Sequence, residues 1–345
     1  MKVLSAALSG GLLVLLFLVI VPALGSLEGV WSAISSMSVL TFLVLLLAAL
    51  AIRVLLAEAY PPLIEGLSFV RSLIARESSS AVSNVVPGPS GTATQYVVLR
   101  SWGVSTERFA GATVSVSVLT DALVFAAPGI FFVIWLLLGM PARADSEHVW
   151  LIGLISLVVA AITVVLVVAV ARSERLARWL GRAGQRCVNP LRRVFHKPAV
   201  TAWPDRAQEL RTSTLGLVEG NARVLGGCIG GGYLLNGFLL VGCLWACGIE
   251  PDVMPVSLGL VLYSIGRLLT IVPITPGAVG VAEVVYTAVY VAVLGEASQD
   301  AVLAGVLVYR ALTWGLPLVT GAFAYVAWRI MRHREIHELS EAEPH

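Results

Sequence analysis

The sequence predicts an all-α polytopic membrane protein with about eight transmembrane helices, in two repeated halves that each contain a Pro/Gly-broken re-entrant segment. Composition is the first observation behind this prediction: of 345 residues, 58% are hydrophobic and 13% are charged, and the mean hydropathy is +0.89. A soluble domain is typically about one quarter charged, so this composition indicates a membrane protein. The other two observations are a series of long apolar runs and a Pro-Gly motif that occurs twice.

Most of the apolar runs are long enough to cross a bilayer. The first ends at Ala23-Leu-Gly25, which resembles a signal-peptidase site. A signal-peptide core is usually about 7–15 residues and this run is longer, so we expect a first span and leave cleavage as an alternative. The predicted spans are Met1–Leu24, Val39–Leu56, Phe109–Leu138, Trp150–Ala171, Val224–Cys247, Val256–Ile271, Val281–Leu294 and Ala301–Trp328.

A basic stretch between the fourth and fifth predicted spans sets the expected orientation. Positive residues concentrate in cytoplasmic loops, so we expect both this stretch and the two termini on the cytoplasmic side of the cell membrane. The predicted divisions are a first membrane half (1–171), a basic linker (172–213), a second membrane half (214–330) and a polar tail (331–345). The linker arginines either only set the topology or also bind anionic headgroups. The basic residues are Arg172, Arg175, Arg178, Arg182, Arg186, Arg192, Arg193, Lys197, Arg206 and Arg211.

The pattern P-G-x-x-G-x-A occurs once in each half, as Pro87–Ala93 and as Pro276–Ala282. Each copy precedes a span that carries a polar residue at membrane depth, Asp121 in the first half and Arg310 in the second. Broken segments at corresponding positions of two halves indicate a transporter's binding site. We expect an inverted repeat, although a span count different by one makes the repeat parallel.

The second copy lies in the stretch Ile271–Glu283, where prolines and glycines interrupt an apolar run that ends on a carboxylate. Proline removes a backbone donor, and broken backbone at membrane depth is tolerated only where protein buries it or where it lines a wet cavity. We therefore predict a half-membrane helix whose end faces a polar cavity. The alternative is a simple polar turn, with Glu283 at the start of a helix.

Two motifs of the second half carry a family resemblance. Pro273-Ile-Thr-Pro-Gly-Ala-Val-Gly-Val-Ala-Glu283, followed by Tyr309-Arg-Ala-Leu-Thr-Trp-Gly-Leu-Pro317, resembles the flippase-like membrane domain of lysylphosphatidylglycerol synthases, in its stand-alone form. The first half is similar through Asn84-Val-Val-Pro87 and Leu99-Arg100. The resemblance implies movement or presentation of an anionic lipid, either a phospholipid or a polyprenyl-phosphate carrier. It also implies a possible partner, a glycosyltransferase or a lipid-modifying enzyme.

The sequence departs from the family pattern in three places. Ala278 stands where the family usually has a second glycine, and Val118 where many members carry a charge ahead of Asp121. Only a short polar segment follows Trp328, so we expect no aminoacyl-transferase domain and no lipid aminoacylation by this chain.

The residues predicted to bind the lipid are centred on Arg310 and Glu283. An intramembrane charge usually faces a partner or a cavity, so we expect these two to pair, and a guanidinium also binds phosphate bidentately. The alternatives are a purely structural ion pair, a snorkelling role for Arg267, and capping or interfacial roles for the first-half residues. The complete candidate set is Arg310, Glu283, Arg267, Pro276, Gly277, Gly280, Tyr309, Asn84, Pro87, Gly91, Arg100 and Asp121.

These observations favour a lipid flippase over two other classes of function. One alternative is a non-catalytic membrane partner of a glycosyltransferase or lipid synthase, and a less favoured one is a membrane enzyme that acts on a lipid-linked substrate. The five histidines fall in predicted loops or the tail, and no predicted span contains a carboxylate pair. We therefore expect no metal, no cofactor and no catalytic residues. The net charge of only +2 gives no indication of a nucleic-acid partner.

Overall fold

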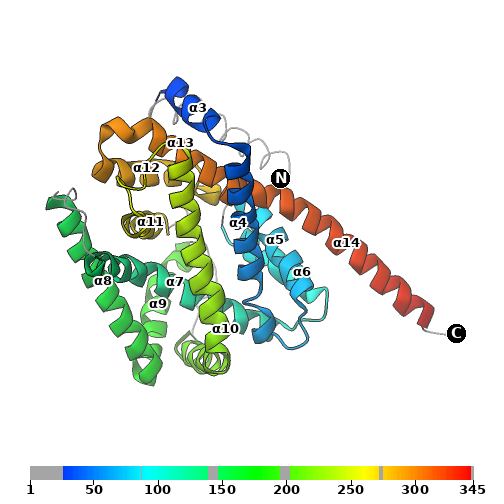
Figure 1. Cartoon of the computed structure of the whole chain (residues 1–345). Coiled ribbons are helices and arrows are strands. Elements are labelled where there is room, and N and C mark those ends of the chain that lie inside the picture. The colour runs from blue at the N-terminus through cyan, green and yellow to red at the C-terminus, as the bar shows by residue number, and fades with distance from the viewer. Residues whose placement is uncertain (1–25, 87, 139–146, 195–202, 272–274, 343–345) are drawn as a thin grey trace.

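The computed structural model describes residues 26–86, 88–138, 147–194, 203–271 and 275–342, and within these ranges the chain is helical without strands (Figure 1). The predicted first span, Met1–Leu24, lies outside the described residues. The α-helices are α3 (Leu27–Ser35), α4 (Val39–Ala57), α5 (Phe69–Val85), α6 (Ser90–Arg100), α7 (Thr106–Leu137), α8 (Glu147–Arg172), α9 (Glu174–Val194), α10 (Trp203–Ala246), α11 (Val256–Leu269), α12 (Val281–Leu294), α13 (Gln299–Arg310) and α14 (Leu316–Ala342).

Six segments of the described chain are long and apolar enough to cross a membrane, so this is a multi-pass membrane protein. These segments overlap six of the predicted spans. The number eight and the re-entrant insertion of the broken segments stay predictions. The candidate spans are Val39–Leu63, Thr106–Leu137, Gly153–Arg172, Ala207–Ala246, Pro276–Leu294 and Glu296–His333.

Three predicted elements differ from the structure. The predicted span Val256–Ile271 is the 14-residue helix α11, about 21 Å long and shorter than the roughly 30 Å hydrocarbon core. The predicted span Ala301–Trp328 is interrupted after Arg310 by a π-helical turn, Ala311–Gly315, and α14 then runs on to Ala342. The basic linker is not a loop, since it contains α9 and the start of α10.

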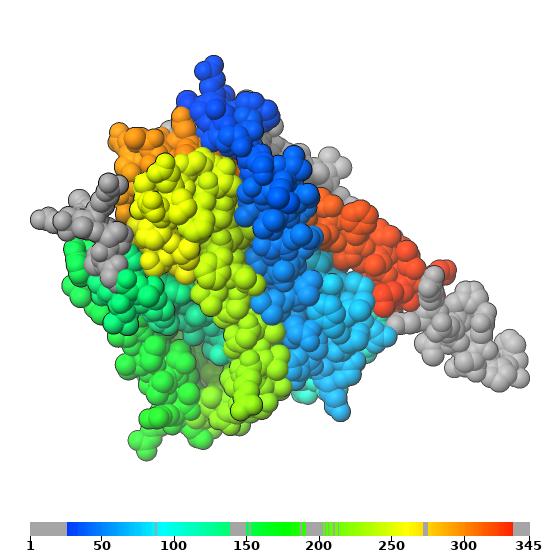
Figure 2. Space-filling view, viewed as in Figure 1, coloured from blue at the N-terminus to red at the C-terminus, as the bar shows by residue number. Residues whose placement is uncertain are grey.

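Helix α10 is the central element of the bundle (Figure 1). It contributes to two hydrophobic clusters, one with α4, α7, α11, α12 and α13 and the other with α5, α6, α7 and α14. Gly231 and Gly232 let Leu55 and Leu56 of α4 approach its backbone closely. Figure 2 shows α4 and α10 side by side through the middle of one face. Small residues in α10 therefore permit the tight packing of the centre.

Helix α14 of the predicted second half packs against α5 of the predicted first half, in one of the most extensive helix contacts of the described chain. Gly321 of α14 lies where an added Cβ would come within 2.6 Å of the Glu77 carbonyl oxygen of α5. Glycine at this position thus allows the two backbones to approach. The contact holds α5, which leads into the first break, beside the part of the second half that follows Arg310.

Candidate functional site

The second Pro-Gly segment forms a compact turn between α11 and α12. Pro276–Ala278 makes one 3-10 turn, and Gly277 and Gly280 have φ values of 57° and 84°, which favour glycine. Ala278 also has a positive φ, 56°, and it is the only non-glycine residue with one among the described residues. This conformation explains in physical terms why a second glycine suits the position where the sequence has Ala278.

Glu283 and Arg310 form an ion pair at this turn. Arg310 Nε donates to Glu283 Oε1 at 2.8 Å, and the Glu283 side chain is only 2% exposed. The other carboxylate oxygen accepts the Gly280 N–H at 2.6 Å and so caps the start of α12. Arg310 Nη2 donates to the Gly277 carbonyl at 2.6 Å. The predicted pairing of Glu283 with Arg310 is therefore confirmed. Glu283 also lies at the start of a helix, as the alternative interpretation of this stretch expected.

The second Pro-Gly segment and the turn after Arg310 meet the end of α5, just before the first Pro-Gly segment. Asn84, near the end of α5, donates its Nδ2 to the Trp314 carbonyl oxygen at 2.8 Å. An added Cβ on Gly277 would lie 3.3 Å from Asn84 Cα and would overlap the Trp314 indole. Trp314 belongs to the π-helical turn that follows Arg310. Such turns occur often at functional sites. This turn places the Trp314 carbonyl against Asn84 of α5.

We expect Gly277→Ala to lower the free energy of unfolding by about 2 kcal/mol or more, because alanine resists the positive φ and its Cβ meets Trp314. Thermal unfolding of the purified protein in detergent measures the effect. Gly226→Ala is the matched control, since nothing lies within 4 Å of its Cβ position in α10, and alanine favours a helix by up to about 1 kcal/mol there. Equal melting temperatures for the two variants would contradict the contact.

A cavity of 580 Å³ lies between the two breaks and α10, and both halves contribute to its wall. It is lined by Leu56, Ala59, Arg76, Ser83, Asn84, Gly88, Val116, Thr120, Val124, Ile229, Gly232, Tyr233, Asn236, Tyr263, Arg267, Thr270, Ile271, Thr275, Pro276, Gly277, Ala278, Ala282, Tyr286, Tyr309, Arg310 and Thr313.

The charged side chains in this lining are three arginines, Arg76, Arg267 and Arg310, and no described lining residue is a carboxylate. Arg310 uses two of its five N–H donors on Glu283 and Gly277. The guanidinium groups of Arg76 and Arg267 form no hydrogen bond or ion pair with a described residue. The cavity is therefore electropositive and rich in free donors.

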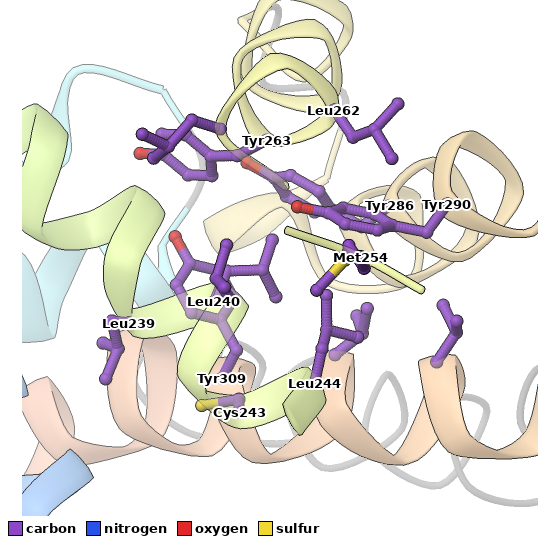
Figure 3. Packing of buried hydrophobic residues seen from close by; sticks show 14 of the residues in the cluster. Leu239, Leu240, Cys243, Leu244, Met254, Leu262, Tyr263, Tyr286, Tyr290 and Tyr309 are labelled. Carbon is purple, nitrogen blue, oxygen red and sulfur yellow. The ribbon is translucent and has the colours of Figure 1, made fainter. Parts of the chain in front are cut away.

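Four tyrosines from four helices line the cavity and form a continuous aromatic series. Figure 3 shows three of them, Tyr263, Tyr286 and Tyr309. The ring centroids of Tyr233 and Tyr263 are 5.3 Å apart, those of Tyr263 and Tyr286 are 6.2 Å apart, and those of Tyr286 and Tyr309 are 6.0 Å apart. The Tyr233 hydroxyl has no described hydrogen-bond partner although the residue is only 7% exposed. Aromatic packing thus fixes phenol groups beside the arginines.

The structure brings six of the predicted site residues to the cavity wall, namely Arg310, Arg267, Pro276, Gly277, Tyr309 and Asn84. Glu283 and Gly280 lie directly behind it and hold Arg310 and α12 in place. Pro87 lies outside the described residues.

Three predicted residues do not line the cavity. Gly91 packs against Ser79 and Ser83 in the α5–α6 hairpin. Arg100 is exposed at the end of α6, where it donates to Tyr96 Oη and Thr106 Oγ1. Asp121 is exposed on α7 and comes within electrostatic range of Arg267 without forming an ion pair. Their expected roles in lipid binding therefore have no support in the cavity lining.

Sequence reasoning missed Arg76 and a second buried ion pair. Arg53 Nε donates to the two oxygens of Glu77 at 2.8 and 2.7 Å, and the Thr320 hydroxyl donates to Glu77 Oε2. A signal was present, since Arg76 lies in the helix that precedes the first break, as Arg267 lies in the helix that precedes the second.

Comparison with known proteins gives one family match. The model described as the lysylphosphatidylglycerol synthase TM region matches residues 3–321 of the 345-residue chain. No curated protein matches the chain.

Proposed function

The chain belongs to the family of the lysylphosphatidylglycerol synthase TM region, and from this premise we propose that it moves an anionic lipid across the membrane that its apolar helices span. Family membership supports a function related to membrane lipids. The observation that carries the more specific proposal is the electropositive cavity, which is walled by both broken segments and lined by three arginines without a carboxylate among its described lining.

The chemistry of the cavity suits a lipid phosphate. Arginine presents a planar array of donors that binds phosphate oxygens bidentately, and Arg310 is held in place by Glu283 and the Gly277 carbonyl. Arg267 and the tyrosine hydroxyls provide further donors around the same space. In this proposal the headgroup enters the cavity while the hydrocarbon tails stay in the bilayer.

The arrangement of the two breaks supports alternating access. Broken helices near the middle of a membrane form the fixed binding site in many transporters, and the repeated units move around that site. Here the end of α5 contacts the second break and the turn after Arg310 through Asn84, Gly277 and Trp314. Because these contacts cross between the halves, we propose that they rearrange when the cavity opens to the other side.

Reconstitution tests the proposal directly. Vesicles that contain the purified protein and a trace of phosphatidylglycerol or phosphatidic acid with a fluorescent acyl chain are treated with dithionite, which bleaches only the outer leaflet. We expect the protein to carry inner-leaflet lipid outward at least about tenfold faster than protein-free vesicles do. Vesicles with an unrelated multi-pass protein control for leak. Equal rates in all vesicles would refute the proposed transport.

The proposal places α9 and both termini in the cytoplasm. The exposed arginines Arg172, Arg175, Arg178, Arg182 and Arg186 lie at the end of α8 and along α9, and this excess of positive charge is typical of the inner side. We expect Arg182→Cys and His333→Cys, each in a background whose native cysteines are replaced by alanine, to resist an impermeant maleimide in intact cells. Both should react after permeabilisation. Ready labelling of intact cells would reverse the orientation.

The exposed arginines of α9 favour a second candidate function, in which the protein is a membrane partner that docks a glycosyltransferase or lipid synthase. An arginine-rich face of this kind can bind an acidic protein surface as well as anionic headgroups. This candidate predicts no transport by the protein alone in the vesicle assay.

A further inference from the structure

We propose that the headgroup bound in the cavity carries two negative charges on phosphate, as a phosphomonoester or a diphosphate, rather than the single charge of a phosphodiester. This inference rests on the proposed lipid-binding function of the cavity. It follows from which charges around the cavity are already paired and which are not.

The two buried carboxylates near the cavity are each already paired. Glu283 has one oxygen bound to Arg310 and the other to the Gly280 N–H. Glu77 accepts from Arg53 and Thr320 and lies behind a small side pocket lined by Arg53 and Arg76. Neither carboxylate forms an ion pair with Arg76 or Arg267.

Arg76 and Arg267 therefore leave about two positive charges at the cavity without a bonded counterion among the described residues. Asp121 lies within electrostatic range of Arg267 but forms no ion pair with it and does not line the cavity. Charges that lie inside a membrane protein usually face a partner or a ligand. A phosphodiester would neutralise only one of these arginines, whereas two charges on phosphate would neutralise both.

The two arginines line the same cavity and belong to different predicted halves of the chain. Arg76 comes from α5 of the first half and Arg267 from α11 of the second, each in the helix that leads into its break. The same cavity is lined by Tyr233, whose buried hydroxyl has no described partner, and by Asn84, whose amide already donates one N–H to the Trp314 carbonyl. A phosphomonoester or diphosphate has enough acceptor oxygens for these donors. A lysyl ester would instead bring added positive charge toward both arginines.

Binding to the purified full chain in a nonionic detergent tests the inference, with calorimetry as the readout. The probes are dihexanoyl phosphatidic acid, farnesyl diphosphate, dihexanoyl phosphatidylglycerol and inorganic pyrophosphate. We expect at least one of the two dianionic lipids to bind about tenfold tighter than phosphatidylglycerol, because a charge-assisted contact contributes about that much. Which of them binds identifies a glycerolipid or a prenyl source, and pyrophosphate binding without lipid preference identifies a free anion.

Two variants and one control test whether Arg76 and Arg267 cause the preference for a dianionic lipid. Arg76→Gln and Arg267→Gln should each reduce the preference for the dianionic lipid about tenfold while weakening phosphatidylglycerol binding less. Both variants should melt at or above the wild-type temperature without ligand, because each removes an uncompensated cation. Arg108→Gln is the control, since Arg108 is 56% exposed and pairs only weakly, at 3.3 Å, with the exposed Glu65.

A wild-type pH titration keeps the test independent of folding. A phosphomonoester loses its second charge on acidification through a pKa of about 6, so phosphatidic acid binding should weaken between pH 8 and pH 5 more than phosphatidylglycerol binding does. Equal affinity for the two lipids, or equal loss with pH, overturns the inference even if the protein transports lipid. A dianionic preference without transport in vesicles supports the inference and contradicts the proposed function.

Discussion

Arg310→Ala and Glu283→Ala are each expected to lower the free energy of unfolding by about 3–5 kcal/mol, because each leaves one buried charge without its partner. The Glu283 side chain is 2% exposed and that of Arg310 is 14% exposed. Glu283→Ala additionally removes the acceptor of the Gly280 N–H at the start of α12. The double variant should recover part of the loss, since no unpaired charge remains.

Arg310→Lys separates the structural role of this residue from lipid binding. Lysine keeps the charge and a bond to Glu283, so the protein should fold, but it cannot bind phosphate bidentately or hold Gly277 in the same geometry. We expect translocation to fall at least about tenfold in the vesicle assay while thermal stability in detergent changes little. Arg108→Lys serves as the exposed control. Wild-type transport by a stable Arg310→Lys protein would end the idea that Arg310 contacts the headgroup.

The second half of the site was predictable because its signals are local in the sequence. Prolines and glycines mark the break, and Glu283 and Arg310 are charges within apolar runs that must find partners. In the structure the second broken segment lies against the end of α5, through Gly277 and Asn84. The lengths of the apolar runs located most of the membrane helices for the same reason.

The first half was less predictable because its key contacts depend on tertiary packing. Arg53 lies near the end of an apolar run, where a long side chain normally snorkels, so its pairing with Glu77 was not expected. Helix α5 contains several polar residues and was not predicted to span the membrane. Arg76 and Glu77 were therefore not considered as intramembrane charges. Asp121 was predicted to bind lipid because it lies within an apolar run. In the structure it is exposed and does not line the cavity.

The π-helical turn after Arg310 also has no clear sequence signal. Ala311–Gly315 contains no proline and a single glycine, and the apolar run continues through it. The turn follows the arginine that bonds back to Gly277, and its Trp314 carbonyl accepts from Asn84. The π-helical turn therefore occurs together with hydrogen bonds that join three separate segments. A sequence pattern within one segment cannot predict such bonds.

The Arg53–Glu77 pair is the other place where one substitution should have a large effect. Glu77 lies on α5, Arg53 on α4 and Thr320 on α14, so this carboxylate joins the two halves. Its side chain is 6% exposed and that of Arg53 is 15% exposed. We expect Glu77→Ala to lower the free energy of unfolding by about 3–5 kcal/mol, because Arg53 is left unpaired beside Arg76.

Companion variants show whether the charge or the shape of Glu77 is responsible. Glu77→Gln preserves the volume and an acceptor for the Thr320 hydroxyl but still leaves Arg53 without a counterion, so it should destabilise nearly as much as alanine. Glu77→Gln combined with Arg53→Met should recover most of the loss, since a well-packed apolar replacement of a buried pair is often neutral. Thermal unfolding in detergent measures the series. Glu65→Ala, in an exposed pair with Arg108, should cost at most about 1 kcal/mol. A Glu77→Ala protein as stable as Glu65→Ala would show that the ion pair does not hold the halves together.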